Sequence, residues 1–435
     1  MLRSLAFAAA LLVFSVPASA QLSSPEQLMV QTVDAEQERT IAMLERWVNQ
    51  NSGTLNPAGI RAVGEMVRAE LEPLGFKVQW VQGTADRAPH LVARHAPRPR
   101  GRGKKMLLIG HLDTVFEPSS PFQRWERKGG EATGPGAGDD KGGMAVMISA
   151  LRAMNAAGTL KRADITVFLS GDEEDAGSPI EVARRDLIAE GKRADVAFDF
   201  EGLVRDGGRD MGSTARRSSG EWMVRVTARS GHSSGIFAQG SGSGAVYELA
   251  RILDTFRREV PEDKLTFNVG IMAGGTTAEL SDGRNEVRAT GKGNIIPGVA
   301  IARGDLRAIS QEQIDRAKAK MSAIVARSLN GAKAEIVFEP GDYPPMSPTT
   351  GNRALLTRLN AVNRDLGLDE QGELDPVKRG AGDISFVAAD VDALAGLGAS
   401  SYGDHAPGET VDLPSIFRQA KRAAILLSRL SRERR

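Results

Sequence analysis

Histidine and acidic residues gather in five segments of the sequence that are rich in glycine or follow apolar runs. The segments are GHLDTV (110–115), GPGAGDDKGGM (134–144), GDEEDAGS (171–178), ADVAFDFEG (194–202) and YGDHAPGE (402–409). The chain has no cysteine, so any metal must be held by histidine and carboxylate groups. One such segment alone is more often structural. Five of them together predict a metal centre that can activate water for hydrolysis.

The GHLDTV segment directly follows the apolar run KMLLI, which predicts a strand that ends near Gly110. His111 and Asp113 are two residues apart, so they face the same side of an extended chain. One of them can bind a metal while the other orients it. The carboxyl end of a strand is also where open parallel sheets place their ligands.

The GPGAGDDKGGM segment places two aspartates at a loop-to-helix junction. It is not a phosphate-binding loop, because the GxxxxGK[ST] spacing is absent and no serine or threonine follows Lys141. For Asp140 we favour a turn and a helix cap. Asp139 lies at the helix opening, where its carboxylate could bridge two cations.

Three further segments complete the set of candidate residues. The acids of GDEEDAGS follow the run ITVFLS, and they repel one another unless cations or protons compensate. Glu173 and Glu174 can divide the labour there, one binding metal and the other taking a proton from bound water. Asp199 and Glu201 end the next predicted strand on one face, and His405 lies in a late glycine-rich loop.

Strands and helices alternate along the first half of the chain, and this order predicts how the candidate residues are positioned. Helical spacing covers Pro25 to Gln50 and Asn56 to Leu74, with Ser24 and Asn56 as caps. Helices are also predicted at 142–157 and near 178–190, and strands at 76–82, 90–96, 105–110, 163–171 and 194–200. The expected fold class is α/β, with a mainly parallel twisted sheet and helices on both faces.

The pattern changes near residue 218, which indicates an inserted α+β unit. Amphipathic helices are predicted there at 245–260 and 312–329, and strands at 221–230, 265–272, 286–293 and 299–309. A helix at 351–365, a strand at 392–398 and a helix at 413–431 then return to the first pattern. We therefore expect a signal segment at 1–20, one domain in two parts at 21–217 and 339–435, and an inserted domain at 218–338.

The composition is that of an ordinary globular protein and limits the expected partners. Of the 435 residues, 41% are hydrophobic and 26% are charged, and the net charge is +1. This balance gives no general attraction to nucleic acid or to anionic membranes.

The N-terminal sequence MLRSLAFAAALLVFSVPASA has the pattern of a cleaved secretory signal, with a basic start, an apolar run and the exit Ala18-Ser19-Ala20. A membrane anchor is the alternative, but the apolar run is shorter than the roughly 20 residues that span a bilayer. We expect a periplasmic or secreted protein that keeps no membrane contact after signal cleavage.

In order and approximate spacing, the five segments resemble the co-catalytic zinc metallopeptidase family of glutamate carboxypeptidase, acetylornithine and succinyl-diaminopimelate deacylases, and aminoacylase. The likeness covers nearly all of the chain after the signal. GPGxxDDKGG and DEExxGS bring it closest to the glutamate carboxypeptidase branch. The resemblance implies two zinc ions per chain, which cobalt or manganese could replace. It implies His111 and Glu201 as ligands of one ion, Glu174 and His405 as ligands of the other, and Asp139 as the bridge.

The resemblance also implies roles for neighbouring residues. Asp113 would orient His111, and Glu173 would be the general base. A cis peptide bond would join Asp139 to Asp140.

The inserted unit resembles the family's lid or dimerisation domain. His232 in SGHSSG would then stabilise the tetrahedral intermediate, in its own site or in that of a partner in a homodimer. Asn294 in GNIIPG and Arg307 in GDLRAIS would hold the substrate carboxylate or the oxyanion, and the alternative for both is an ordinary role at the end of a strand. The segment 273–293 is longer than the family's equivalent hairpin, and SGHSSG is not the commonest spelling of this motif.

The expected function is hydrolysis of an amide bond next to a free carboxylate, in a glutamate-carboxypeptidase-like exopeptidase that acts on small peptides. An N-acyl-amino-acid deacylase of the same family is the alternative. A periplasmic solute-binding protein would also be exported and two-lobed, but it would not need Glu173 beside Glu174. A catalytically inactive relative is disfavoured because all five ligand positions and the base are present.

Overall fold

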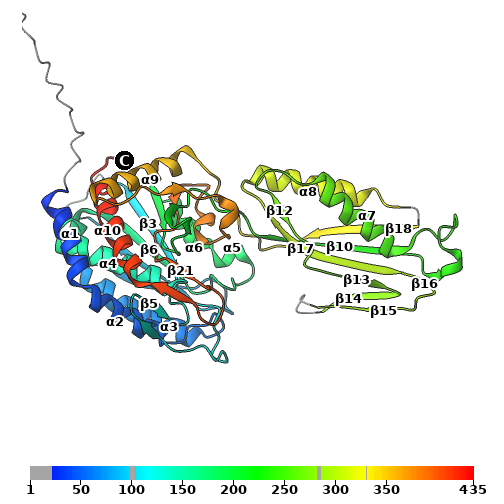
Figure 1. Ribbon diagram of the computed structural model, residues 1–435, viewed down its shortest axis with the longest axis horizontal. Helices are drawn as coiled ribbons and strands as arrows, with labels where there is room; N and C mark the ends of the chain where they lie inside the picture. The colour runs from blue at the N-terminus through cyan, green and yellow to red at the C-terminus, as the bar shows by residue number, and fades with distance from the viewer. Residues whose placement is uncertain (1–21, 98–102, 282–285, 330) are drawn as a thin grey trace, which may run out of the picture.

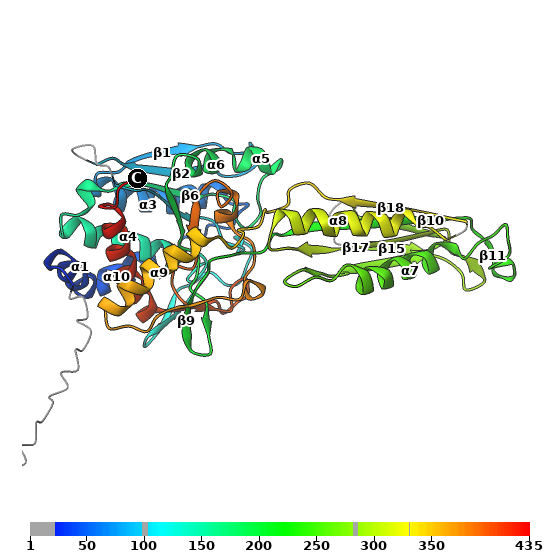
Figure 2. The same ribbon diagram turned by 90° about the horizontal axis from the view of Figure 1, so that it is seen from above.

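The computed structural model describes residues 22–97, 103–281, 286–329 and 331–435. The predicted signal at 1–20 therefore lies outside the described residues. Two bodies lie side by side in Figures 1 and 2, a larger main body and an elongated inserted body that contains the strands from β10 to β18. We retain 218–338 as the proposed limits of the inserted body. No helix of the described chain is long and apolar enough to cross a bilayer.

A six-stranded sheet forms the centre of the main body, in the order β1-β2-β6-β3-β7-β20. Its strands are β1 (Lys77–Val81), β2 (His90–His95), β3 (Lys105–His111), β6 (Asp164–Ser170), β7 (Val196–Asp199) and β20 (Asp392–Leu394). Only β2 runs against the others, because both of its pairings are antiparallel whereas β6, β3, β7 and β20 pair in parallel. The predicted fold class is confirmed.

Helices cover both faces of this sheet because its central strands are apolar on both sides. Met106 and Leu108 of β3 belong to one buried cluster, while Leu107 and Ile109 belong to another. The first cluster lies under α4 (Lys141–Ala156), α9 (Thr350–Asp365) and α10 (Leu413–Leu430), and the second lies under α6 (Arg185–Gly191) and the 3-10 turn η5 (Asp383–Phe386). The two-residue period of a strand sends alternate side chains to opposite faces.

The N-terminal helical region differs in detail from the prediction. The single helix expected from Pro25 to Gln50 is broken at Glu36 into α1 (Ser24–Ala35) and α2 (Gln37–Val48). The predicted cap Ser24 is wrong by one residue, because Ser23 forms a capping box with Glu26. Asn56 caps α3 (Pro57–Leu71) as predicted, with its side chain accepting a hydrogen bond from the Gly59 amide. The 3-10 turn η1 (Glu72–Leu74) follows.

Several short elements of the main body were not predicted. One four-stranded sheet joins β21 (Ser401–Tyr402), β22 (Thr410–Asp412), β5 (Glu131–Thr133) and β4 (Glu126–Lys128). A three-stranded sheet joins β19 (Gly372–Glu373), β9 (Arg209–Gly212) and β8 (Arg205–Asp206). The helix expected near 178–190 is interrupted, with α5 (Ile180–Ala183) preceding α6, and the 3-10 turns η2 (Leu160–Arg162) and η4 (Pro376–Lys378) complete the body.

The inserted body has its own antiparallel sheet and its own apolar core. Strands β12 (Thr266–Phe267), β17 (Val299–Arg307), β10 (Gly220–Ala228) and β18 (Ala332–Phe338) pair in this order, and β13 (Ile271–Gly275) also pairs with β17. Helices α7 (Gly244–Glu259) and α8 (Gln311–Ala326) pack on this sheet around Trp222, Phe256 and Met321. The sequence prediction missed β18.

Two small strand pairs extend the inserted body. The segment 273–293 holds a hairpin of β14 (Thr277–Leu280) and β15 (Val287–Thr290). The other pair joins β11 (Gly231–His232), which precedes that hairpin in sequence, to β16 (Ile295–Ile296), which follows it. The 3-10 turn η3 (Ser233–Gly235) comes directly after β11. Figure 2 shows β11 at the end of the inserted body that points away from the main body.

Candidate metal centre and active site

The candidate residues converge at one edge of the large sheet, where its parallel strands end. His111 is the last residue of β3, and Glu173 and Glu174 follow β6. Glu201 follows β7, and Asp139 lies just before α4. The loop between β21 and β22 brings His405 to the same place. Loops at the carboxyl ends of adjacent parallel strands meet at one edge, which explains the convergence.

Asp139 lies between the two histidines. Its Oδ1 atom is 3.0 Å from Nε2 of His111, and its Oδ2 atom is 3.2 Å from Nε2 of His405. The same Nε2 of His405 is 3.2 Å from Oε2 of Glu174. Each carboxylate oxygen of Asp139 thus faces a different histidine, which is the arrangement that a carboxylate bridging two cations requires.

Two groups of side chains are close enough to hold a metal ion. His111, Asp139 and Glu174 form one group, and His111, Glu173 and Glu201 form the other, with their ligand atoms within 4.8 Å of one another in each group. His405 joins the first group through its contacts with Asp139 and Glu174. Distance alone therefore does not separate Glu173, the predicted base, from the predicted ligands.

His405 has an unusual backbone conformation. Its φ angle is +64°, in the left-handed region that few residues other than glycine adopt. The side chain is 57% exposed, whereas that of His111 is 1% exposed. One histidine thus lies deep in the sheet edge, and the other faces the cavity.

Asp113 is a buried hub beneath this cluster. Its carboxylate accepts hydrogen bonds from the Thr54 hydroxyl at 2.7 Å and from the backbone N–H groups of Glu173 and Glu174, both at 3.0 Å. Its Oδ1 atom lies 3.4 Å from Nδ1 of His111, and its backbone oxygen lies 3.1 Å from the same nitrogen. Asp113 therefore contacts both the histidine that it is predicted to orient and the loop that carries the two glutamates.

Glu201 is held by arginines that the sequence analysis did not single out. Arg216 donates from Nη1 to Oε2 of Glu201 at 2.5 Å and to Asp199 at 2.8 Å. Arg379 donates to the same Glu201 oxygen at 3.3 Å. No motif marks Arg216, which lies in an irregular segment before β10, so its role could be seen only in the folded chain.

Glu409 fixes the loop that carries Asp139. Its carboxylate accepts hydrogen bonds from the backbone N–H groups of Gly136, Gly138 and Asp139, at 2.7–3.1 Å. The expected cis peptide bond between Asp139 and Asp140 is present. Asp140 occupies the N-cap position of α4, but its side chain makes no cap; its Oδ2 atom accepts the backbone N–H of His111 at 3.2 Å. The prediction that Asp140 caps the helix is therefore right for its position in the chain. It is wrong for its side chain, which makes no capping hydrogen bond.

The cluster gathers buried carboxylates and histidines, as a cation-binding site does. Burial and the neighbouring Glu201 carboxylate raise the pKa of Glu173 well above its ordinary value. Burial would also raise the pKa of Asp139, but hydrogen bonds from His111 and His405 hold that pKa well below its ordinary value. Burial raises the pKa of Glu174 although His405 opposes the shift. So many buried carboxylates at one place, with histidines between them, fit divalent cations as counter-charges.

A cavity of about 350 Å³ opens beside the cluster. Asp139, Glu173, Glu201 and His405 line one part of it, and the basic side chains Arg216, Lys378 and Arg379 line another. The cavity thus combines a candidate metal centre with basic side chains that are themselves paired with carboxylates, Arg216 and Arg379 with Glu201 and Lys378 with Asp206.

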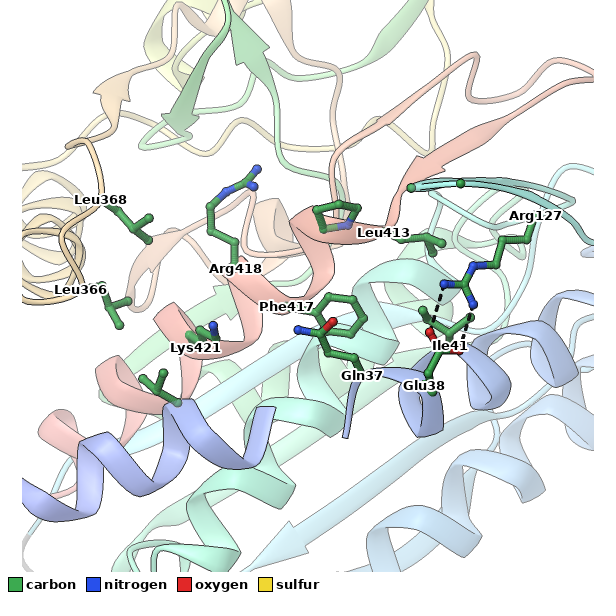
Figure 3. Close-up of a pocket in the computed structure, with 14 residues that line it drawn as sticks. Gln37, Glu38, Ile41, Arg127, Leu366, Leu368, Leu413, Phe417, Arg418 and Lys421 are labelled. Atoms are coloured by element: carbon green, nitrogen blue, oxygen red, sulfur yellow. Dashed lines mark hydrogen bonds and ion pairs between the residues drawn. The ribbon is translucent and has the colours of Figure 1, made fainter. Parts of the chain in front are cut away.

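A second cavity, of about 420 Å³, lies elsewhere and carries none of the candidate residues (Figure 3). Its walls include the apolar side chains of Ile41, Leu413 and Phe417. Its cations are already paired, Arg127 with Glu38, Arg418 with Asp210 and Lys421 with Asp34. The acids and the histidine that could hold a metal ion line the first cavity and not this one.

Of the residues predicted in the inserted body, His232 and Asn294 lie away from the metal centre of their own chain. His232 lies in β11, at the end remote from the main body, and the backbone oxygen of Asn294 accepts a hydrogen bond from Ser233 beside it. The N–H of Ser234 donates to Nδ1 of His232, which leaves the proton of a neutral ring on Nε2. Arg307 ends β17 opposite Thr266, and the Thr266 hydroxyl contacts Arg217 of the segment between the two bodies.

Comparison with known proteins agrees with this geometry. Residues 107–429 match the peptidase family M20/M25/M40, and the chain belongs to this family. It is an enzyme of the metallopeptidase and amidohydrolase type.

Two curated relatives span nearly the whole chain. Carboxypeptidase G2 of Pseudomonas sp. (strain RS-16) is 29% identical, over 97% of this chain and 96% of that protein. Succinyl-diaminopimelate desuccinylase of Azoarcus sp. (strain BH72) is 26% identical, over 89% of this chain and 98% of that protein. A tripeptidase structure from Staphylococcus aureus subsp. aureus Mu50 aligns with a TM-score of 0.71 at 19% identity, over 91% of this chain and 99% of that one, and this match supports the fold alone.

Proposed function

We propose that this protein is a two-zinc exopeptidase of the glutamate carboxypeptidase type, which cleaves the amide bond next to a free carboxylate in small peptides. The position of Asp139 between His111 and His405 carries the proposal, because each oxygen of its carboxylate faces a different histidine, as expected of a carboxylate that bridges two cations. The similarity to carboxypeptidase G2 along nearly the whole chain supports it.

In this proposal the ligands follow the predicted assignment. His111 and Glu201 would hold one zinc, Glu174 and His405 would hold the other, and Asp139 would be shared by both. The arginines on Oε2 of Glu201 leave Oε1 as the oxygen free to bind. Zinc ions bound there would lower the pKa of a shared water and polarise the substrate carbonyl. Cobalt or manganese could serve in place of zinc.

The proton transfers are assigned to Glu173. It takes a proton from the attacking water and returns it to the nitrogen of the leaving amine, so the glutamate ends unchanged. Burial and nearby carboxylates raise its pKa, which suits a group that must both accept and release a proton. Asp113 keeps His111 and the Glu173 backbone in place.

We assign to His232 the stabilisation of the oxyanion that forms in the active site of a neighbouring subunit. Its Nε2–H is the free donor of the ring, but β11 lies at the far end of the inserted body. A homodimer formed through the inserted bodies would bring His232 and Asn294 of one chain to the cavity of the other. Arg307, at the near end of the inserted body, would hold the substrate carboxylate within its own chain.

An N-acyl-amino-acid deacylase is the second candidate, and the similarity to a succinyl-diaminopimelate desuccinylase favours it. A panel of dipeptides and N-acyl amino acids, assayed with and without zinc, separates the two. Release of glutamate from peptides supports the first proposal, and cleavage of acyl substrates alone supports the second. No zinc-dependent cleavage of either class would contradict both.

We also propose export to the periplasm or the medium, from the N-terminal signal pattern alone. N-terminal sequencing of the protein recovered from a bacterial periplasmic extract tests this, since the signal predicts a mature chain that begins near Gln21. Retention of Met1 would contradict it.

A further inference from the structure

The two chain segments that join the bodies are hydrogen-bonded to each other. Ser219, on the way into β10, exchanges backbone hydrogen bonds of 3.1 and 2.8 Å with Tyr343, on the way back from β18. Arg216 and Met346 exchange a second pair, both of 3.0 Å. The connection is therefore a short antiparallel ladder, and its residues have defined positions relative to the main body.

The side chain of Tyr343 extends from this ladder to the loop of the two glutamates. Its hydroxyl lies 2.9 Å from the backbone oxygen of Glu173 and 3.0 Å from Nη2 of Arg184. A guanidinium group can only donate, so the hydroxyl accepts a hydrogen bond from Arg184 and donates one to the backbone carbonyl oxygen of Glu173. The Tyr343 ring packs edge-on against Phe386, with centroids 4.9 Å apart.

Arg184 is itself held by two buried ion pairs. It is fully buried and donates to Asp172 at 2.7 Å and to Asp383 at 2.6 Å. Asp172 also accepts the backbone N–H of Gly177 at 2.9 Å, so the ends of the glutamate loop are tied to one buried cation. A hydroxyl held by such a group has a fixed direction, and its remaining hydrogen bond is directional as well.

The peptide group between Glu173 and Glu174 is consequently held on both sides. Its N–H donates to Asp113 at 3.0 Å, and its C=O accepts from Tyr343 at 2.9 Å. Asp113 comes from the end of β3, and Tyr343 comes from the segment between the bodies. Rotation of this peptide plane would break these hydrogen bonds, so together they fix the backbone from which the Glu173 side chain extends.

We propose that Tyr343 is a positioning residue for the reaction, which orients Glu173 through its backbone carbonyl. This inference rests on the proposed function, in which Glu173 moves the protons. Glu174 depends less on Tyr343, because its carboxylate also contacts His405. The hydroxyl should therefore matter for turnover more than for metal binding.

The test is Tyr343→Phe, which removes the hydroxyl and keeps the ring. We expect kcat to fall by about 10- to 100-fold, as for a misplaced catalytic group, with KM within about twofold and an unchanged zinc content. Tyr247→Phe is the matched control, since Tyr247 is exposed and its hydroxyl has no hydrogen bond within the described chain. Hydrogen exchange of peptides covering 171–177 should rise in Tyr343→Phe and not in the control.

A double variant separates this inference from the proposed function. If Tyr343 acts through Glu173, adding Tyr343→Phe to Glu173→Gln should lower the residual rate little further. Equal fold losses in both backgrounds would overturn the inference, as would a wild-type kcat, loss of zinc or failure to fold in Tyr343→Phe. Near-normal turnover in Glu173→Gln alone would instead overturn the proton-transfer role in the proposed function.

Discussion

Asp113 and Glu174 are 61 residues apart in sequence and are joined by a hydrogen bond of 3.0 Å from the Glu174 backbone to the Asp113 carboxylate. The bond separates the roles of acids that look alike in the sequence. Asp113 is fully buried, and its oxygens already accept three hydrogen bonds, so it has little capacity left for a cation. Glu174 keeps its carboxylate free toward His405.

Asp113→Asn should destabilise the protein even though the two side chains have the same shape. An amide has one acceptor oxygen, and its NH₂ group would face an N–H donor of the loop. We expect the free energy of unfolding to fall by about 1–3 kcal/mol, the cost of an unsatisfied buried donor. Chemical denaturation measures it, with the exposed Asp369→Asn as control. An unchanged stability would show that these hydrogen bonds are dispensable.

Glu173→Gln should abolish proton transfer and retain the metal. The substitution keeps the shape and removes the base, so kcat should fall by about 10²- to 10⁴-fold. Because geometry alone also admits Glu173 as a ligand, zinc content decides between the roles. Elemental analysis should find as much zinc as in the wild type and in the exposed control Glu181→Gln. Loss of an ion would make Glu173 a ligand.

His405→Ala should release about one zinc ion per chain, because His405 contacts only one side of Asp139. His95→Ala is the matched control. His95 ends β2 opposite Ile165, near the start of β6, whereas His111 pairs with Ser170 at the end of β6. His95 and His111 therefore lie near opposite ends of the strands of this sheet, so His95 is remote from the metal centre. An unchanged zinc content in His405→Ala, measured by elemental analysis, would remove His405 from the ligands.

Arg216→Met should destabilise the protein more without zinc than with it. The substitution leaves Asp199 and Glu201 without their shared cation. Breaking such a buried pair costs about 3–5 kcal/mol, and a bound cation near Glu201 should recover part of this. Denaturation with and without zinc measures the difference, with the exposed Arg225→Met as control. Equal losses in both conditions would argue that zinc does not bind near Glu201.

The edge that gathers the site could be predicted, because it follows from local patterns. Apolar runs that come shortly before His111, Glu173-Glu174 and Glu201 predict parallel strands, and the carboxyl ends of such strands meet at one edge of the sheet. The residues that lie outside the five segments and position the metal ligands and Glu173 could not be predicted. Arg216 and Tyr343 lie in irregular segments, and they reach the site only because those segments pair with each other.

Other differences from the prediction also have physical reasons. Ser23 and Ser24 are both good caps, and the capping box with Glu26 selects Ser23. The strand β18 alternates exposed and half-buried residues without a strong apolar signal, so it was not recognised. The position of β11 far from the metal centre depends on the length of the inserted body and on how it joins the main body, which no local motif encodes.

The remote position of His232 leads to a prediction about mixed dimers. If His232 acts in the site of a partner subunit, His232→Ala and Glu173→Gln should each have low activity alone. In a mixed dimer, the His232→Ala chain supplies an intact Glu173, and the other chain supplies an intact His232 to the same site. One site per mixed dimer is then complete. Random exchange of equal amounts should restore about a quarter of the wild-type activity, since about half of the dimers are mixed.

Activity after mixing and subunit exchange, compared with the sum of the separate variants, measures this recovery. Each variant mixed with itself is the control, and size-exclusion chromatography checks that dimers form. Absence of recovery in a dimeric mixture would place His232 in its own chain's site or outside catalysis. A monomer with full activity would exclude the partner-site role altogether, because no second chain would be present to supply the histidine.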